Sequence, residues 1–535
     1  MIERLRSALR SRFTFRRIVL AVALVVAFGG ILALIEDNGG ESVPVDHAVT
    51  VVPADALAYV HVSVRPESEQ WRNAARLAKG FPSLVEARNR FLRSLTARGG
   101  ELNLEREVYP WVDDEAALAL LPGKGGKARS LILLEVSDRD LANAFLERSV
   151  GRVRSSTYRG VPMRTYGSLA TAFLGDFLAI GQPDNVRAAI DVRQGRRGAL
   201  GRDVSFNRSR AALQKRDRLF FGYATPDGLR RVLESQPGVL GQIAHLANVP
   251  ELVGAAATVR AEDRGATLEY AAALRPARQQ GATNADRPYV PQLQNVVPAD
   301  AVGFFDMRGA DRLFDAIAKI GGGSRLRLPG SLEGLSSEVS GAGRAPFRRA
   351  LQPLLGKEAS LFLFPAGESP LLTLVVNNVQ SAEAATMIER LQPLIAKLLE
   401  RPAEGQIPIF QPRQIAGVDA VTLTITPSVE LTFAVFDGHA VISTDPEGIR
   451  LLKSGRSKLA DNPFFERGTK DRLDRVTSVL FLDLEQFFAI GEQAGLRGAA
   501  SFRAFKSALS RVSAISAVTS STPSTKTATI FIEVP

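Results

Sequence analysis

The chain has 535 residues, of which 45% are hydrophobic and 23% are charged, a composition typical of folded globular proteins rather than disordered ones. It contains no cysteine, which excludes disulfides, cysteine-ligated zinc and thiol catalysis. The net charge is +11, but residues 1–17 hold six arginines and one glutamate. The rest of the chain is therefore too weakly basic for a nucleic-acid-binding surface, and we expect no nucleic-acid partner.

The N-terminal region predicts a membrane anchor. Residues 18–35 are an unbroken run of apolar residues and glycines, about the minimum length for a transmembrane helix. A basic segment, residues 1–17, precedes the run, and acidic residues follow it. The positive-inside rule then places the N-terminus in the cytoplasm and the remaining chain outside it. A cleaved signal peptide is the alternative, but the run is long and no small-x-small cleavage site follows it.

The remaining chain repeats itself. The hexapeptide Val-Val-Pro-Ala-Asp-Ala at residues 51–56 recurs at residues 296–301, and residues 110–122 resemble residues 353–365. A repeat of this length indicates a duplicated domain rather than a solenoid. The predicted organisation is a tether at residues 36–50, a first copy at 51–274, a linker at 275–295 and a second copy at 296–535.

Strands and helices alternate within each copy. In the first copy, short apolar segments joined by turn residues predict strands, and amphipathic segments that begin near Pro66, Asp138 and Pro183 predict helices. Tight turns between neighbouring strands require antiparallel pairing. The predicted class is α+β, two antiparallel-sheet domains with helices packed on one side of each sheet. The strands are expected at residues 58–64, 115–121, 130–136, 169–174, 177–180, 218–223, 252–261 and 265–273.

The repeated Val-Pro-Ala-Asp-Ala motif after an N-terminal anchor resembles a bacterial family of membrane-anchored proteins with a domain of unknown function, number 3352. The resemblance covers nearly everything after Val51. It implies the two-copy architecture. It implies no activity and assigns no functional residue.

Known catalytic motifs are incomplete or missing. Residues 123–127 (Gly-Lys-Gly-Gly-Lys) lack the first glycine and the final hydroxyl residue of a phosphate-binding loop, which favours a hairpin turn. The run Asp113-Asp114-Glu115 could hold a divalent cation. However, the second copy has Gly356-Lys357-Glu358 there, which favours a solvated turn.

His61 and Asp306 are the two candidate site residues. His61 lies in the first predicted strand, on the same face as Tyr59 and Ser63, and Asp306 is its counterpart in the second copy. A polar position that stays polar between aromatic neighbours could line a cleft. The alternative is a half-exposed sheet face with hydrogen-bonded polar side chains.

These observations predict a single-pass protein of the cytoplasmic membrane whose bulk is a non-enzymatic binding or scaffold module of the bacterial cell envelope. The expected partners are the membrane, through residues 18–35, and an envelope protein or lipid. A carrier of lipid or another apolar ligand is the first alternative, and a hydrolase of envelope polymers is the second. We expect no catalytic residue, cofactor or metal ligand. A hydrolase would require His61 or Asp306 to face a concave pocket beside a second acid or base.

Overall fold

A computed structural model of the protein describes most of the chain after residue 44. The described residues are 45–63, 68–79, 107–123, 128–149, 153–213, 218–234, 251–275, 287–309, 349–350, 354, 356–365, 370–399, 410–426, 429–493 and 495–535. The predicted membrane anchor, residues 18–35, and most of the glycine-rich turn at residues 123–127 lie outside these ranges. Within them, no helix is both long enough and apolar enough to cross a membrane.

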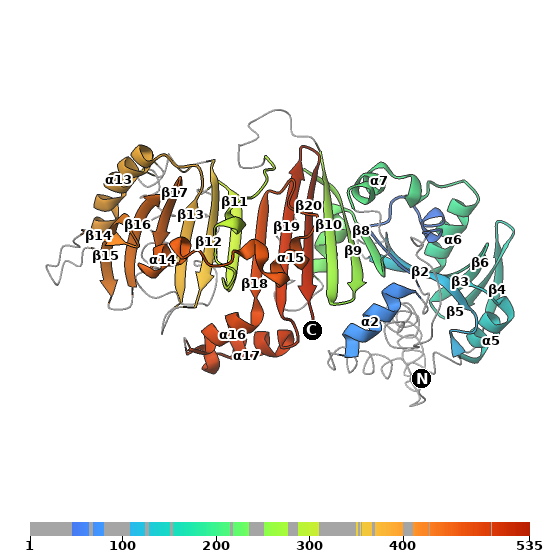
Figure 1. Ribbon diagram of the computed structural model, residues 1–535. Helices are drawn as coiled ribbons and strands as arrows, with labels where there is room; N and C mark the ends of the chain where they lie inside the picture. The colour runs from blue at the N-terminus through green and yellow to red at the C-terminus, as the bar shows by residue number, and fades with distance from the viewer. Residues whose placement is uncertain are drawn as a thin grey trace, which may run out of the picture. The chain divides into compact units, whose positions relative to one another are not determined.

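The chain divides into two compact units, residues 1–277 with 523–527, and residues 278–522 with 528–535. Each unit contains an antiparallel sheet with helices, drawn as arrows and coiled ribbons in Figure 1. The prediction of a mixed α+β fold with antiparallel sheets is therefore confirmed.

In the described residues of the first unit, the sheet has ten strands, and the pairings between them are antiparallel. In spatial order the strands are β4 (Arg154–Tyr158), β5 (Val161–Tyr166), β6 (Leu169–Leu174), β7 (Phe177–Gly181), β3 (Ala128–Val136), β2 (Val112–Pro122), β1 (Ala58–Ser63), β8 (Phe220–Ala224), β9 (Leu252–Glu262) and β10 (Gly265–Leu274). Its helices are η2 (Ala48–Thr50), α2 (Glu69–Lys79), α5 (Arg139–Ser149), α6 (Pro183–Arg193), η4 (Leu200–Arg202), α7 (Val204–Ala211) and α8 (Pro226–Glu234).

The sheet of the second unit is built in the corresponding order. Its strands are β14 (Gln411–Ile415), β15 (Val418–Thr426), β16 (Val429–Phe436), β17 (His439–Ser443), β13 (Leu371–Val376), β12 (Glu358–Phe364), β11 (Gly303–Arg308), β18 (Ser478–Asp483), β19 (Ala514–Thr522) and β20 (Thr525–Glu533). Its helices are η7 (Leu293–Asn295), α13 (Ser381–Leu399), α14 (Glu447–Lys453), η9 (Leu459–Asp461), α15 (Pro463–Thr469), α16 (Leu484–Gln493), η10 (Leu496–Gly498) and α17 (Ala500–Leu509).

Helices cover both faces of each sheet, so the prediction that they pack on one side is wrong. Neighbouring residues of a strand point to opposite faces. In the first unit, Leu133 packs in one core with helix residues Ile190 of α6 and Phe206 of α7. The next residue, Leu134, packs in a separate core with Phe145 of α5. The long apolar runs of the central strands are the reason, because a strand buried on both faces has no polar side to leave in water.

The second unit has the same two-sided arrangement. Val375 of β13 packs in one core with Ile449 of α14 and Phe465 of α15. The adjacent Leu374 packs in another core with Met387 of α13. Each sheet is therefore the middle layer of three.

The segments that enter the two units are parts of their cores. We call residues 45–50 and 287–295 the entry segments. Ala48 and Val49 are buried in the core of the first unit, and Tyr289 and Leu293 are buried in the core of the second. The predicted tether at residues 36–50 and linker at 275–295 are therefore wrong for these residues. Their turn-forming composition suggested exposed connections, whereas their few apolar side chains pack against the sheets.

Candidate functional site

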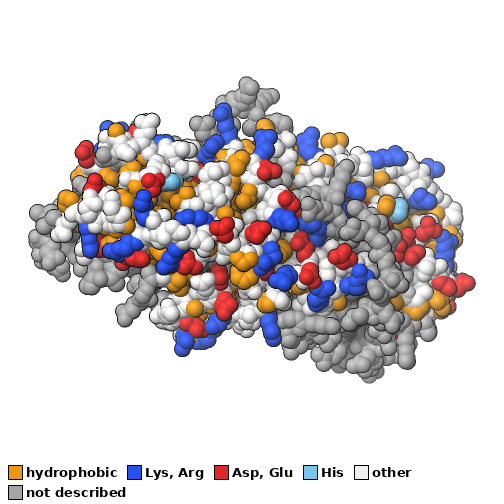
Figure 2. Space-filling view, in the orientation of Figure 1, with side chains coloured by type: hydrophobic (Ala, Val, Ile, Leu, Met, Phe, Trp, Pro, Cys, Tyr) orange, Lys and Arg blue, Asp and Glu red, His pale blue; other side chains and the backbone are white. Residues whose placement is uncertain are grey.

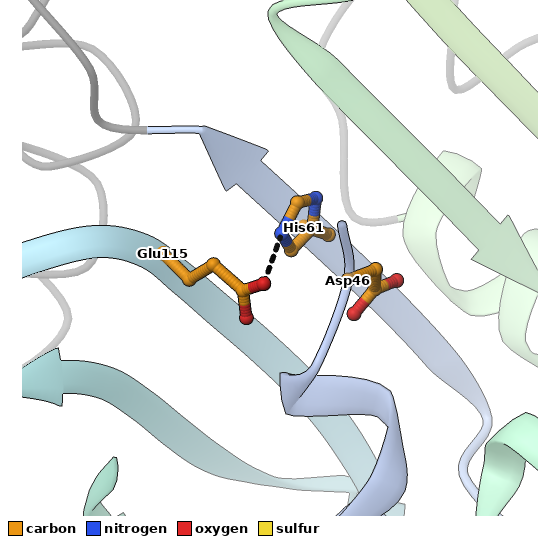
Figure 3. Close-up of side chains that lie close together, drawn as sticks. All are labelled: Asp46, His61 and Glu115. Carbon is orange, nitrogen blue, oxygen red and sulfur yellow. Dashed lines mark ion pairs between the residues drawn. The ribbon is translucent and has the colours of Figure 1, made fainter. Parts of the chain in front are cut away.

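Three ionisable side chains from separate parts of the first unit meet beneath its entry segment. Asp46 comes from the entry segment, His61 from β1 and Glu115 from β2, and the two carboxylates lie on either side of the imidazole (Figure 3). One ligand atom from each residue lies within 4.8 Å of the other two. The three residues are only 6%, 2% and 3% exposed. This grouping brings together residues that are up to 69 positions apart in the sequence.

Glu115 holds the start of the 3-10 helix η2. Its carboxylate accepts the backbone N–H of His47 at 2.9 Å and that of Ala48 at 3.1 Å. The Nδ1 atom of the His47 side chain lies 3.0 Å from the same carboxylate. The first N–H groups of a helix have no partner within the helix, and an acceptor such as this one satisfies them.

Asp46 is fixed by hydrogen bonds on one carboxylate oxygen. Its Oδ1 accepts the hydroxyl of Tyr59 at 2.6 Å and the backbone N–H of Val49 at 3.1 Å. Tyr59 in turn packs edge-to-face on Phe206, with 6.2 Å between the ring centroids. Burial, followed by the charge and the hydrogen bond of Asp46, raises the pKa of Tyr59, so the hydroxyl stays protonated as a donor.

The imidazole of His61 is incompletely satisfied. Its Nε2 lies 3.9 Å from Oε1 of Glu115 and has no hydrogen-bond partner in the described part of the chain, and neither does Oδ2 of Asp46. Burial lowers the pKa of His61 and outweighs the opposing effect of the two carboxylates. The ring is therefore neutral near pH 7, the form in which a ring nitrogen can accept a proton or bind a metal ion.

The second unit has a related arrangement with different chemistry. Glu358 accepts the backbone N–H groups of Gln292 at 2.5 Å and Leu293 at 3.0 Å, as Glu115 does for η2. Asp306 accepts a hydrogen bond from the hydroxyl of Tyr289 in the entry segment. Burial and then the charge of Glu358 raise the pKa of Asp306, against the opposing effect of the Tyr289 hydrogen bond.

His61 and Asp306 do occupy matching places. In β1, His61 pairs with Ala117 and Ser63 pairs with Glu115. In β11, Asp306 pairs with Ser360 and Arg308 pairs with Glu358. Both candidates lie beside a carboxyl or hydroxyl partner, as a catalytic role would require. However, they are only 2% and 0% exposed, so the half-exposed sheet face is wrong, and a substrate has no access to either side chain in this conformation.

The run Asp113-Asp114-Glu115 does not form one site. Asp113 is exposed, whereas Glu115 is buried, and the pairing of β2 with β3 is irregular between Val112 and Ala116. Their charges nevertheless act together on a fourth acid, Glu135. Burial, followed by the charges of Glu115, Asp113 and Asp114, raises the pKa of Glu135 in β3 to about 7.

Sequence reasoning missed Asp46 and Tyr289. Both residues lie in segments that were predicted to be exposed connections. The signal that could have found them is the recurrence of Glu115 as Glu358, because a carboxylate kept at a buried strand entry needs donors from a nearby segment.

A family model described as "Protein of unknown function (DUF3352)" matches residues 18–534. The chain belongs to this family. The match spans nearly the whole chain and confirms the family that the sequence resembles, without bearing on a membrane anchor. It assigns no function.

Three crystal forms of a protein named TP0453 are also similar to this chain. Forms I, IV and III share 13%, 10% and 12% sequence identity with it, at TM-scores of 0.26, 0.25 and 0.25. The matches cover 44%, 42% and 46% of this chain and 82%, 79% and 90% of TP0453. A similarity this weak indicates nothing about function. No curated protein matches the chain.

Proposed function

We propose that the protein is a membrane-anchored, extracytoplasmic binding or scaffold module of the bacterial cell envelope and is not an enzyme. One observation carries the proposal: in both units the buried carboxylate at the start of the second strand holds the entry segment on the sheet. Glu115 and Glu358 each accept two consecutive backbone N–H groups. Glu115 and Glu358 are thus buried from solvent, and their hydrogen bonds stabilise the fold.

We further propose that the two units are copies of one domain. The corresponding strand orders support this, as does the shared register in which His61 and Asp306 pair with Ala117 and Ser360. Two similar three-layer units on one chain provide two sets of sheet and helix surfaces, which suits a protein that binds other molecules.

The membrane placement is supported by the sequence of residues 1–35, with six arginines before the apolar run. The surface charge supports partners other than nucleic acid. Figure 2 shows basic and acidic side chains interspersed over the visible face, with no broad area of one sign among the coloured residues. We propose an envelope protein as the main partner, with lipid as the alternative.

Protease added to intact spheroplasts should digest the 57.7 kDa chain, because nearly all of it would lie outside the cytoplasmic membrane. A cytoplasmic marker protein should survive in the same sample, and detergent-lysed cells provide the control for complete access. Full protection of the chain in intact spheroplasts would contradict the proposed topology.

Crosslinking in cells, followed by purification of the full chain in detergent, should give a reproducible adduct with another envelope protein. Native mass spectrometry of the same preparation, without crosslinker, should show no bound lipid at fixed stoichiometry. A lipid retained at one or two copies per chain, together with the absence of a protein adduct, would contradict the scaffold function and support that of a lipid carrier.

A further inference from the structure

We propose that Asp46, His61 and Glu115 form a binding site for one divalent transition-metal ion of the zinc class. The site lies inside the first unit, between the entry segment and strands β1 and β2. This inference concerns the unit's interior and is independent of the membrane placement and of the partners proposed above.

The first argument is geometric. Zinc binds imidazole nitrogen and carboxylate oxygen at about 2.0–2.2 Å, so ligand atoms around one ion lie roughly 3–4 Å apart. The Nε2 atom of His61 and Oε1 of Glu115 are 3.9 Å apart, and the full set of three ligand atoms lies within 4.8 Å. A small inward shift of one side chain would bring all three ligand atoms within coordination distance of a single ion.

The second argument is the unmet hydrogen-bonding capacity of two buried groups. Nε2 of His61 and Oδ2 of Asp46 have no partner among the described residues, although both residues are more than nine-tenths buried. Leaving a buried polar group without a partner is unfavourable, because its lost hydration is not replaced. A cation between them would satisfy both groups at once.

The third argument is that the ligands are already oriented. The Tyr59 hydroxyl and the Val49 N–H hold Asp46 through its other oxygen, and the backbone of η2 holds Glu115. Such outer hydrogen bonds fix metal-binding side chains in most metalloproteins. Three protein ligands leave one coordination position for a water molecule. Because the site is closed to substrate and lies where the entry segment meets the sheet, the ion would hold that segment in place rather than act in catalysis.

The choice of metal follows from the ligands. Imidazole nitrogen suits zinc and its neighbours, whereas calcium and magnesium prefer oxygen ligands.

The second unit provides an internal comparison. By sequence position, Pro291 replaces Asp46 and Asp306 replaces His61, while Glu358 remains. The Tyr289 hydroxyl donates to Asp306 there. The imidazole and one carboxylate are thus lost, and a phenol from the entry segment takes the place of an ion. We therefore expect one zinc ion per chain rather than two.

The test uses the full chain in detergent, stripped with a chelator and dialysed against zinc chloride, with bound zinc measured by mass spectrometry. Wild type should retain one zinc per chain, and His61→Ala and Asp46→Asn should each weaken binding by more than about tenfold, a lower bound set by the effect of losing an outer-shell partner. His439→Ala and Asp306→Asn, which alter a histidine and an acid outside the site, should bind zinc like wild type. Calcium at the same concentration should not be retained.

Equal zinc retention by wild type and His61→Ala would overturn the proposal, as would no retention by wild type. Circular dichroism of each variant separates loss of the site from loss of the fold, and Asp46→Asn keeps the shape of the side chain. X-ray absorption of zinc-loaded wild type gives a result that needs no variant. Nitrogen and oxygen ligands with imidazole scattering are expected, and a zinc shell without imidazole would also overturn the proposal.

Discussion

Glu358→Ala is expected to destabilise the second unit by about 1–3 kcal/mol, because it leaves one buried donor and two partly buried donors without their acceptor. These donors are the backbone N–H groups of Gln292 and Leu293 and the side-chain amide of Asn377, which donates to Oε2 at 2.9 Å. Urea unfolding of the full chain, monitored with a separate spectroscopic probe in each unit, measures the decrease in the free energy of unfolding. Glu115→Ala should have a comparable effect on the first unit.

The matched control is Glu447→Ala. Glu447 forms an exposed ion pair with Arg450 one helical turn away, and exposed pairs of this kind contribute at most about 0.5 kcal/mol. If Glu358→Ala and Glu447→Ala shifted the unfolding curve equally, Glu358 would not hold the entry segment.

Asp306→Asn is expected to change how the stability of the second unit depends on pH. The raised pKa of Asp306 means that the folded state binds a proton more tightly than the unfolded state. The stabilisation from this proton is fully present below the ordinary carboxyl pKa, near pH 4. It is lost as the pH rises toward the folded pKa, at about 1.4 kcal/mol per pH unit. Asparagine cannot ionise and can still accept the Tyr289 hydroxyl, so the variant should lose this slope.

Urea unfolding at several values between pH 4 and pH 8 tests this prediction. The difference in unfolding free energy between the variant and wild type should move in favour of the variant as the pH rises. Asp300→Asn is the control, since Asp300 is exposed and pairs only with the surface residue Arg456 among the described residues. A pH-independent difference for Asp306→Asn would show that Asp306 does not stay protonated in the fold.

The local structure was predictable from the sequence because the relevant signals act over a few residues. A helix was predicted to begin near Asp138, and the carboxylate of this residue accepts the N–H groups of Asp140 and Leu141 at the start of α5. The Asp437-Gly438 turn joins β16 to β17 with positive φ at both residues, as a two-residue hairpin of this sequence requires.

The layering was not predicted, because the burial of a strand's second face depends on residues far away. Leu131-Ile132-Leu133-Leu134 in β3 shows no alternation, which is the pattern of a strand covered on both faces. It was interpreted only as a strand. The helices that cover its two faces, α5 and α6, follow at different distances along the chain. No local sequence pattern indicates which face of the sheet each helix packs against.

The candidate site was predicted in part. His61 and Asp306 were identified because a polar residue recurs at one strand position, and both are buried beside acidic or phenolic partners. The partners themselves, Asp46 and Tyr289, are brought in by the entry segments. Their positions depend on tertiary contacts with Glu115 and Glu358, which are more than 60 residues away. Such long-range pairing leaves no local pattern in a single sequence.

Amide hydrogen exchange on the Glu115→Ala and Glu358→Ala variants tests most directly whether these buried acids hold the entry segments. In wild type, peptides that cover residues 45–50 and 287–295 should both be protected, because several of their N–H groups are hydrogen-bonded to buried carboxylates. Glu115→Ala should accelerate exchange in residues 45–50 and leave 287–295 unchanged, and Glu358→Ala should do the reverse. Unchanged protection of both segments in both variants would contradict this structural role of Glu115 and Glu358. It would instead favour a role for these two acids in binding or catalysis.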